Sequence, residues 1–149
     1  HLESIIETLP WVATIDKFQH WLYENPMHSI EERQSKWLEI YEQFSDSVTD
    51  WSGLEDFKKY IWQKQLHIYE VPFYYIEYGM AQLGAIGVWR NYKQHPQQGL
   101  EGYLNALKLG YTAPISEIYA AANIPFDFSK DYITELMNFV REELEGLKK

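Results

Sequence analysis

The sequence predicts an all-α protein, a single helical domain of about seven helices that covers residues 1–149. Three observations support this fold class. Apolar residues recur three and four positions apart through most of the chain, as on one face of a helix. Helix start and stop residues bound these segments. No stretch alternates between apolar and polar residues for long enough to require a strand.

The first half of the chain carries three of the predicted helical segments. Residues 2–22 have helical spacing, and Pro10 inside them either kinks one helix or opens a second. Asn25-Pro26 ends this segment. Ser29 and Glu32 form a capping-box pattern at the start of the second helix. After a polar loop, we expect a third helix over residues 54–67.

The second half begins with the most unusual segment of the sequence. Residues 73–89 form a long apolar stretch that contains Gly79, Gly84 and Gly87. Each glycine costs a surface helix about 0.8–1 kcal/mol, so we expect a central, buried helix on which Ala81, Gly84, Ala85 and Gly87 allow close packing. Glycine and proline signals predict three more helices, over residues 96–110, 114–122 and 129–144.

Composition excludes several classes of protein. Hydrophobic residues make up 46% of the chain and aromatic residues 17%, which is typical of a packed domain and not of a disordered segment. A formal charge of −9 repels phosphate backbones, so we expect no nucleic-acid partner. No apolar run approaches the roughly 18 residues that span a bilayer, and we expect no membrane partner.

The chain has no cysteine, which argues against disulfides and favours a cytoplasmic setting. It begins with His1, directly before an apolar-periodic stretch and without a signal-peptide pattern. We therefore expect a piece of a longer protein.

No complete catalytic motif is present in the sequence. The H-E-x-x-H pattern of zinc hydrolases is absent, and no two of the five histidines are three or four residues apart. There is no G-x-S-x-G sequence for a serine nucleophile. The sequence therefore predicts that this chain supplies no metal ligands.

A tyrosine cluster is the strongest remaining candidate for a site. Tyr74 and Tyr78 are four residues apart, so they share a face if both are helical, and Tyr75 is three residues from Tyr78. A tyrosine hydroxyl can donate a hydrogen bond to a developing oxyanion, and His67 could do the same. From spacing alone, packing in a core is the simpler interpretation.

Four sequence blocks carry a resemblance to a known family. They are HIYEVPFYYIEYGMAQLGA at residues 67–85, LPWVATIDKFQHW at 9–21, DWSGL at 50–54 and IPFDFS at 124–129. Taken in chain order, they resemble the C-terminal part of oligoendopeptidase F-like zinc metallopeptidases, relatives of thimet oligopeptidase. The resemblance extends over essentially the whole chain.

The resemblance implies a helical fold with a deep substrate channel and a zinc ion held by H-E-x-x-H and a downstream glutamate. On the family pattern these ligands would lie before residue 1, so zinc belongs to the full-length enzyme and none is bound here. The resemblance implies catalytic roles for Tyr78, Tyr74 and His67 beside the zinc. It also implies a substrate-binding role for Tyr75.

A weaker substrate-binding candidate is Tyr111, in the Gly110-Tyr111-Thr112 turn, which a simple helix stop also explains. The leading hypothesis is a C-terminal portion of a zinc oligoendopeptidase that hydrolyses short peptides and is inactive alone. The alternative is a stand-alone helical module that binds peptides or proteins. Because a channel wall without its other half exposes aromatic residues, we also expect self-association.

Overall fold

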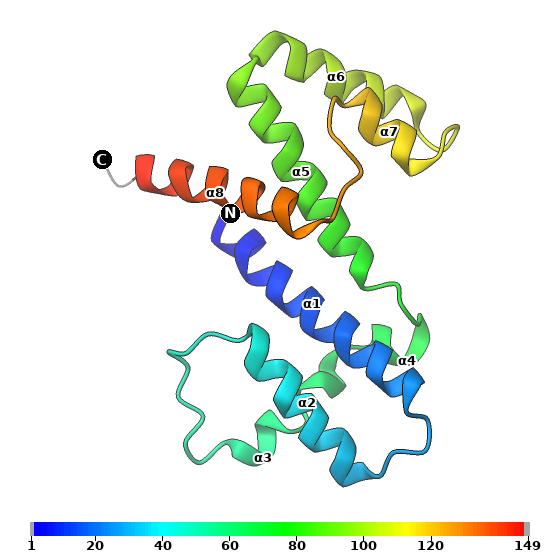
Figure 1. Cartoon of the computed structure of the whole chain (residues 1–149), viewed down its shortest axis with the longest axis vertical. Helices are drawn as coiled ribbons and strands as arrows, with labels where there is room; N and C mark the ends of the chain where they lie inside the picture. Colours follow the sequence, from blue (N-terminus) through cyan, green and yellow to red (C-terminus); the bar gives the residue numbers. More distant parts are fainter. Residues whose placement is uncertain (1, 148–149) are drawn as a thin grey trace. The chain divides into compact units, whose positions relative to one another are not determined.

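The computed structural model describes residues 2–147, and its helices follow one another as Figure 1 shows. His1, on which part of the sequence argument rests, lies outside the described residues. Residues 2–147 contain eight α-helices, one 3-10 helix and no strand, which confirms the all-α fold class. The helices are α1 (Leu2–Glu24), α2 (Ile30–Phe44), α3 (Glu55–Lys58), η1 (Ile61–Lys64), α4 (His67–Glu70), α5 (Ile76–Gln94), α6 (Pro96–Leu109), α7 (Ile115–Ala121) and α8 (Lys130–Gly146).

The chain forms two compact units that divide within α5, the first ending at Gly79 and the second beginning at Met80. The single domain over residues 1–149 stays a prediction. Among residues 2–147, no helix has both the length and the apolar character needed to cross a bilayer.

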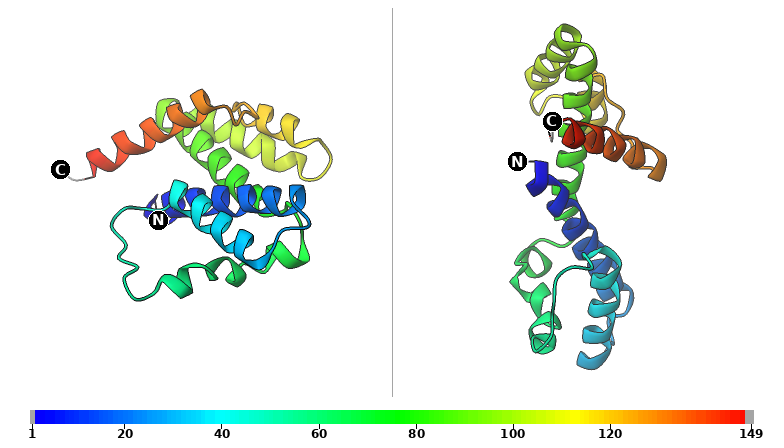
Figure 2. Two further views of the ribbon diagram at one scale, coloured as in Figure 1. Left: turned by 60° about the horizontal axis from the view of Figure 1, so that its bottom comes forward. Right: turned by 90° about the vertical axis from the view of Figure 1, so that its left-hand side faces the viewer.

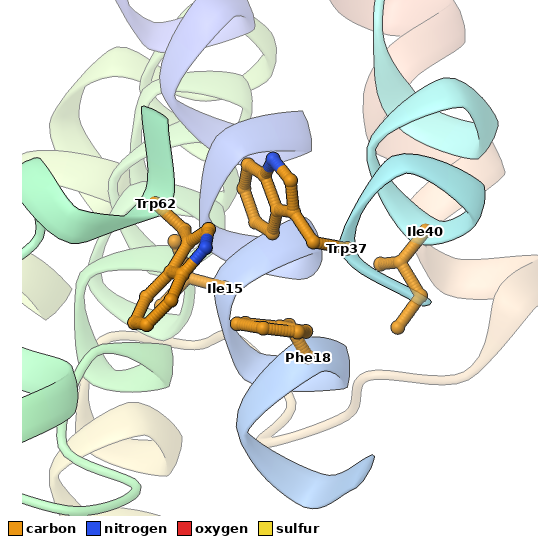
Figure 3. Close-up of a cluster of buried hydrophobic side chains, with 5 residues drawn as sticks. All are labelled: Ile15, Phe18, Trp37, Ile40 and Trp62. Atoms are coloured by element: carbon orange, nitrogen blue, oxygen red, sulfur yellow. The ribbon is translucent and has the colours of Figure 1, made fainter. Parts of the chain in front are cut away.

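The first unit is built on α1 and α2, which pack as neighbours (Figure 2). Pro10 lies inside one continuous α1, so of the two alternatives it does not open a second helix. The core of the unit consists of Ile15, Phe18, Trp37, Ile40 and Trp62, all almost fully buried (Figure 3). Aromatic rings dominate this core, and burying each of them removes a large apolar area from water.

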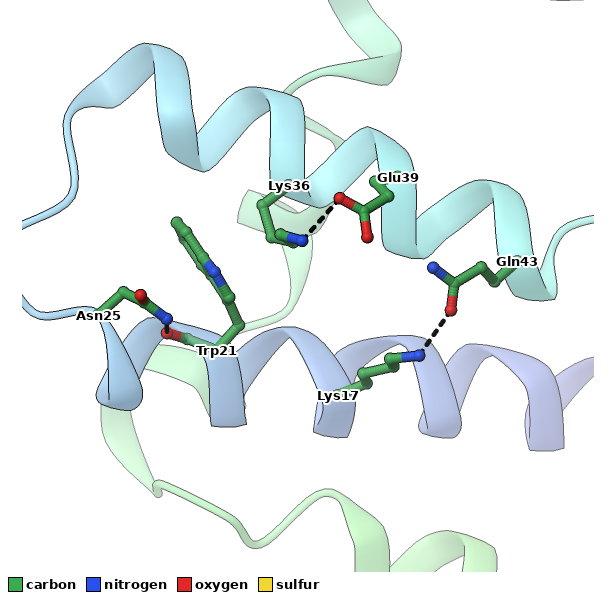
Figure 4. A network of polar contacts seen from close by, with 6 residues as sticks. All are labelled: Lys17, Trp21, Asn25, Lys36, Glu39 and Gln43. Atoms are coloured by element: carbon green, nitrogen blue, oxygen red, sulfur yellow. Dashed lines mark hydrogen bonds and ion pairs between the residues drawn. The ribbon is translucent and has the colours of Figure 1, made fainter.

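Polar contacts hold the rim of the α1–α2 pair (Figure 4). The Lys17 ammonium donates to Gln43 Oε1 at 2.6 Å and joins the two helices. The capping box is formed as predicted, because Ser29 Oγ accepts from the Glu32 amide and Glu32 Oε2 accepts from the Ser29 amide. Local sequence therefore fixes where α2 begins.

The prediction of one helix over residues 54–67 is wrong. The structure has three short pieces there, α3, η1 and α4. The carbonyl of Lys58 accepts a hydrogen bond from Trp37 Nε1 at 2.9 Å. In a continuous helix that carbonyl would accept from the amide of residue 62. The buried indole of Trp62 is instead carried into the core by the irregular backbone.

The start of the central helix also differs from the prediction. α5 begins at Ile76 and not at residue 73. Phe73 has a φ of +59°, which is the left-handed conformation that a bulky side chain rarely adopts and that a right-handed helix excludes. Tyr74 and Tyr75 consequently lie in a turn before α5, while Tyr78 lies in its first turn.

The second unit packs α7 and α8 against the glycine positions of α5. A Cβ at Gly84 would lie 2.6 Å from Tyr119 Oη, and one at Gly87 would lie 3.1 Å from Tyr132 Oη. The predicted close packing is therefore confirmed at these two glycines. It is wrong at Ala81 and Ala85, which are exposed, so α5 is buried on one face only.

Candidate functional site

The predicted site residues of the first unit come from a short stretch of irregular backbone between η1 and α5. His67 opens α4, Tyr74 and Tyr75 lie in the turn after it, and Tyr78 lies in α5. The tyrosine pair does not share a helix face as predicted, because Tyr74 precedes the helix. Their rings nevertheless meet, with centroids 6.0 Å apart.

His67 is at the centre of this group, which we call the aromatic cluster (His67, Tyr74, Tyr75 and Tyr78). Its ring centroid lies 6.1 Å from that of Tyr74, 4.9 Å from Tyr75 and 5.5 Å from Tyr78. His67 Nε2 and Tyr78 Oη are 3.2 Å apart, within hydrogen-bonding distance. The structure thus brings together four of the five predicted site residues.

The members of the cluster differ in exposure. Tyr74 and Tyr78 are 44% and 42% exposed, so their hydroxyl groups can reach a ligand. Tyr75 is half-buried, and burial raises the pKa of its hydroxyl. A raised pKa keeps the phenol of Tyr75 protonated at neutral pH, so it remains a hydrogen-bond donor.

The fifth predicted residue, Tyr111, lies in the second unit. Its side chain is fully exposed in the turn between α6 and α7. Gly110 before it has a φ of +51° and ends α6, as the sequence predicts. The substrate-binding role of Tyr111 stays a prediction.

Two residues of the site were not identified from the sequence. Trp11 Nε1 on α1 donates a hydrogen bond to Gln65 Oε1 at 3.0 Å, and Gln65 Nε2 lies 2.6 Å from His67 Nδ1. Trp11 and Gln65 are 54 residues apart, and no spacing rule connects them. The sequence offers one indication of a role for Trp11, its place in the block at residues 9–21 that carries the family resemblance.

A third such residue is Gln19, which holds the turn that carries Tyr74. Its side chain is 1% exposed, and its Oε1 accepts a hydrogen bond from the Phe73 amide at 2.9 Å. The Phe73 ring lies between those of His20 and Tyr23, with centroids 4.8 and 5.0 Å away. These contacts offset the cost of the left-handed backbone, which is roughly 1–2 kcal/mol.

The described residues do not fit a catalytic zinc ion. Such an ion takes three protein ligands, and within residues 2–147 no three histidine or carboxylate side chains gather where they could hold a metal. Within the described part of the chain, His20 and Asp16 form one histidine–carboxylate pair, with Nε2 and Oδ2 3.6 Å apart.

Comparison with known proteins identifies the class of this chain. A solved X-ray structure, provisionally named oligoendopeptidase F, is similar to it with a TM-score of 0.79 and 32% sequence identity. The match covers 97% of this chain and 26% of that one. In both fold and sequence, the chain is therefore similar to part of that structure.

The sequence profile of peptidase family M3 matches residues 1–138, and the chain therefore belongs to this family. Members of the family use zinc. A search among curated protein sequences finds no significant match. The chain spans about a quarter of the length of the solved structure that it resembles.

Proposed function

We propose that this chain forms the substrate-contacting side of a zinc-dependent oligoendopeptidase that hydrolyses short peptides in the cytoplasm. Membership in a peptidase family implies peptide substrates. The metal ligands would come from a part of the enzyme outside residues 2–147. The observation that supports the proposal most directly is the aromatic cluster, in which the exposed phenols of Tyr74 and Tyr78 both contact the His67 imidazole.

The proposed chemical role of Tyr78 is to donate a hydrogen bond to the carbonyl oxygen of the scissile peptide bond. During hydrolysis this oxygen gains negative charge as the carbonyl carbon becomes tetrahedral. A phenol suits the task because it is neutral at working pH and presents its proton on a rigid ring. Tyr74 is the second donor, His67 assists Tyr78, and Tyr75 contacts the peptide from the buried side of the cluster.

The test is substitution of the tyrosines in the complete enzyme. Loss of one oxyanion donor typically lowers turnover by about 10²–10³. Because the hydrogen bond strengthens in the transition state, Tyr78→Phe should lower kcat more than it raises KM. Tyr74→Phe tests the second donor in the same way.

The matched control is Tyr103→Phe on α6, because Tyr103 is 43% exposed, close to Tyr74 and Tyr78. It should leave kcat unchanged, and zinc content should stay the same in all variants. A kcat within about twofold of the wild type for both Tyr78→Phe and Tyr74→Phe would show that these tyrosines only pack. Sequencing the coding region before residue 1 is an independent test, since the absence of H-E-x-x-H there would favour a stand-alone interaction module.

A further inference from the structure

A chain of side-chain hydrogen bonds connects α1 to the aromatic cluster, and all of its members belong to the first unit. Trp11 Nε1 donates to Gln65 Oε1 at 3.0 Å. Gln65 Nε2 is 2.6 Å from His67 Nδ1, and His67 Nε2 is 3.2 Å from Tyr78 Oη. The four side chains therefore form one continuous path that ends at the exposed phenol.

The direction of every hydrogen bond in this path follows from its first member. An indole N–H is a donor only, so the Gln65 atom that faces Trp11 is the carbonyl oxygen. The other end of the amide, which faces His67, is consequently the NH2 group. That group donates, so His67 Nδ1 must accept and carries no proton.

The neutral imidazole then has its single proton on Nε2. This proton points at Tyr78 Oη, whose lone pair accepts it. The hydroxyl proton of Tyr78 is left without a partner in the path and is directed away from His67. Because the Tyr78 side chain is 42% exposed, this proton is available to a ligand.

Packing keeps the first two members of the path in place. Trp11 is half-buried, with its ring edge-to-face with Trp37 at a centroid distance of 5.9 Å. The Lys64 ammonium covers the Trp11 ring at 4.5 Å from the centroid, a cation–π contact. Gln65 is also half-buried, and both ends of its amide have a partner, Trp11 at Oε1 and His67 at Nε2.

We propose that Trp11 and Gln65 are positioning residues that hold His67 in the Nε2–H tautomer, so that the Tyr78 hydroxyl donates a hydrogen bond to the peptide carbonyl. The catalytic part of this inference rests on the proposed function, whereas the tautomer does not. With the opposite tautomer, Nε2 would accept a hydrogen bond from the Tyr78 hydroxyl. That hydroxyl would then no longer be free to donate to the substrate. The orientation of one amide thus decides whether Tyr78 is a donor.

Gln65→Glu is the sharpest test because it keeps the size of the side chain and reverses its hydrogen bonding. A carboxylate still accepts from Trp11, but it offers His67 an acceptor in place of a donor. The proton of the imidazole should then move to Nδ1. The matched control is Gln63→Glu, which adds the same charge at an exposed position two residues earlier.

The tautomer is measured in the chain itself, labelled with ¹⁵N-histidine, at a pH at which the imidazole is neutral. In the wild type and in Gln63→Glu, His67 Nδ1 should resonate as an unprotonated, pyridine-type nitrogen. In Gln65→Glu the unprotonated, pyridine-type nitrogen should instead be Nε2. In Gln65→Met both tautomers should be populated and should exchange with each other. A His67 tautomer that is the same in wild type and Gln65→Glu, with both proteins folded by circular dichroism, would overturn the proposal.

The catalytic consequence is measured in the complete enzyme. Gln65→Glu should lower kcat by about 10²–10³, the loss expected for one donor, with little change in KM. Combined with Tyr78→Phe it should cause no further loss, because Gln65 acts through Tyr78.

Additive losses in the double variant would contradict a positioning role for Gln65. If Tyr78→Phe alone leaves kcat unchanged, the proposed donor role of Tyr78 fails, and the catalytic part of this inference fails with it. The tautomer measurement separates these cases, because it depends on neither zinc nor substrate.

Discussion

Gly84→Ala should destabilise the second unit, although alanine is the better helix former. Gly84 on α5 faces Tyr119 on α7, and an added Cβ would lie 2.6 Å from Tyr119 Oη and 2.9 Å from Cζ. The same hydroxyl donates to the Met80 carbonyl at 2.9 Å. Burial raises the pKa of Tyr119, so its hydroxyl stays protonated and remains a donor. The methyl group must therefore displace the phenol and break this hydrogen bond.

The expected magnitude follows from three opposing contributions. Overpacking a well-filled site costs about 1–3 kcal/mol. Loss of the partly buried hydrogen bond to the Met80 carbonyl adds about 0.5–1.5 kcal/mol. The higher helix propensity of alanine offsets about 0.8–1.0 kcal/mol. The free energy of unfolding should therefore fall by roughly 0.5–3.7 kcal/mol.

Urea unfolding followed by circular dichroism measures this change, with Gly146→Ala as the matched control. Among residues 2–147, no atom outside the neighbouring residues and the backbone of α8 itself lies within 4 Å of a Cβ at Gly146, the last residue of α8. The control should therefore be as stable as the wild type or slightly more stable. Tyr119→Phe added to Gly84→Ala removes the closest clashing atom and should recover part of the loss. Equal stability of Gly84→Ala and Gly146→Ala would refute the packing argument for this glycine.

Two further predictions concern the first unit and the surface. Gln19→Met should lower the free energy of unfolding by about 1–3 kcal/mol, because it leaves the Phe73 amide without its acceptor, and hydrogen exchange at Phe73 should accelerate. The exposed control Gln98→Met should change neither quantity. The chain should also self-associate, because large apolar side chains such as Met27 and Tyr111 are exposed; a strict monomer in sedimentation at high concentration would contradict this.

Features with local causes could be predicted from the sequence. The capping box at Ser29 and the glycine stop at Gly110 each depend on residues within one turn, and both are formed as expected. The all-α class follows from spacing that repeats through the chain. The predicted site group also formed, because His67 and the three tyrosines lie within twelve residues of one another.

Features with long-range causes could not be predicted. The break after α3 depends on Trp37, which is 21 residues from Lys58 in the sequence and donates a hydrogen bond from its indole N–H to the Lys58 carbonyl. The late start of α5 depends on Phe73, whose amide is held by a glutamine from another helix. The helical spacing of apolar residues predicts neither contact, because both are tertiary hydrogen bonds between a backbone group and a distant side chain.

The geometry of the aromatic cluster is set largely by α1. This helix supplies Trp11, which orients Gln65 and through it His67, and Gln19, which fixes the turn before Tyr74. Between these two positions, Ile15 and Phe18 lie in the core, both fully buried. A packed core holds its side chains in single rotamers, so the two anchors project from a rigid base. The irregular backbone from residue 65 to residue 75 can then present its side chains in one arrangement, although it has no regular structure of its own beyond α4. The aromatic core of the first unit therefore also holds the proposed hydrogen-bond donor in place, because the core fixes α1 and α1 carries Trp11 and Gln19.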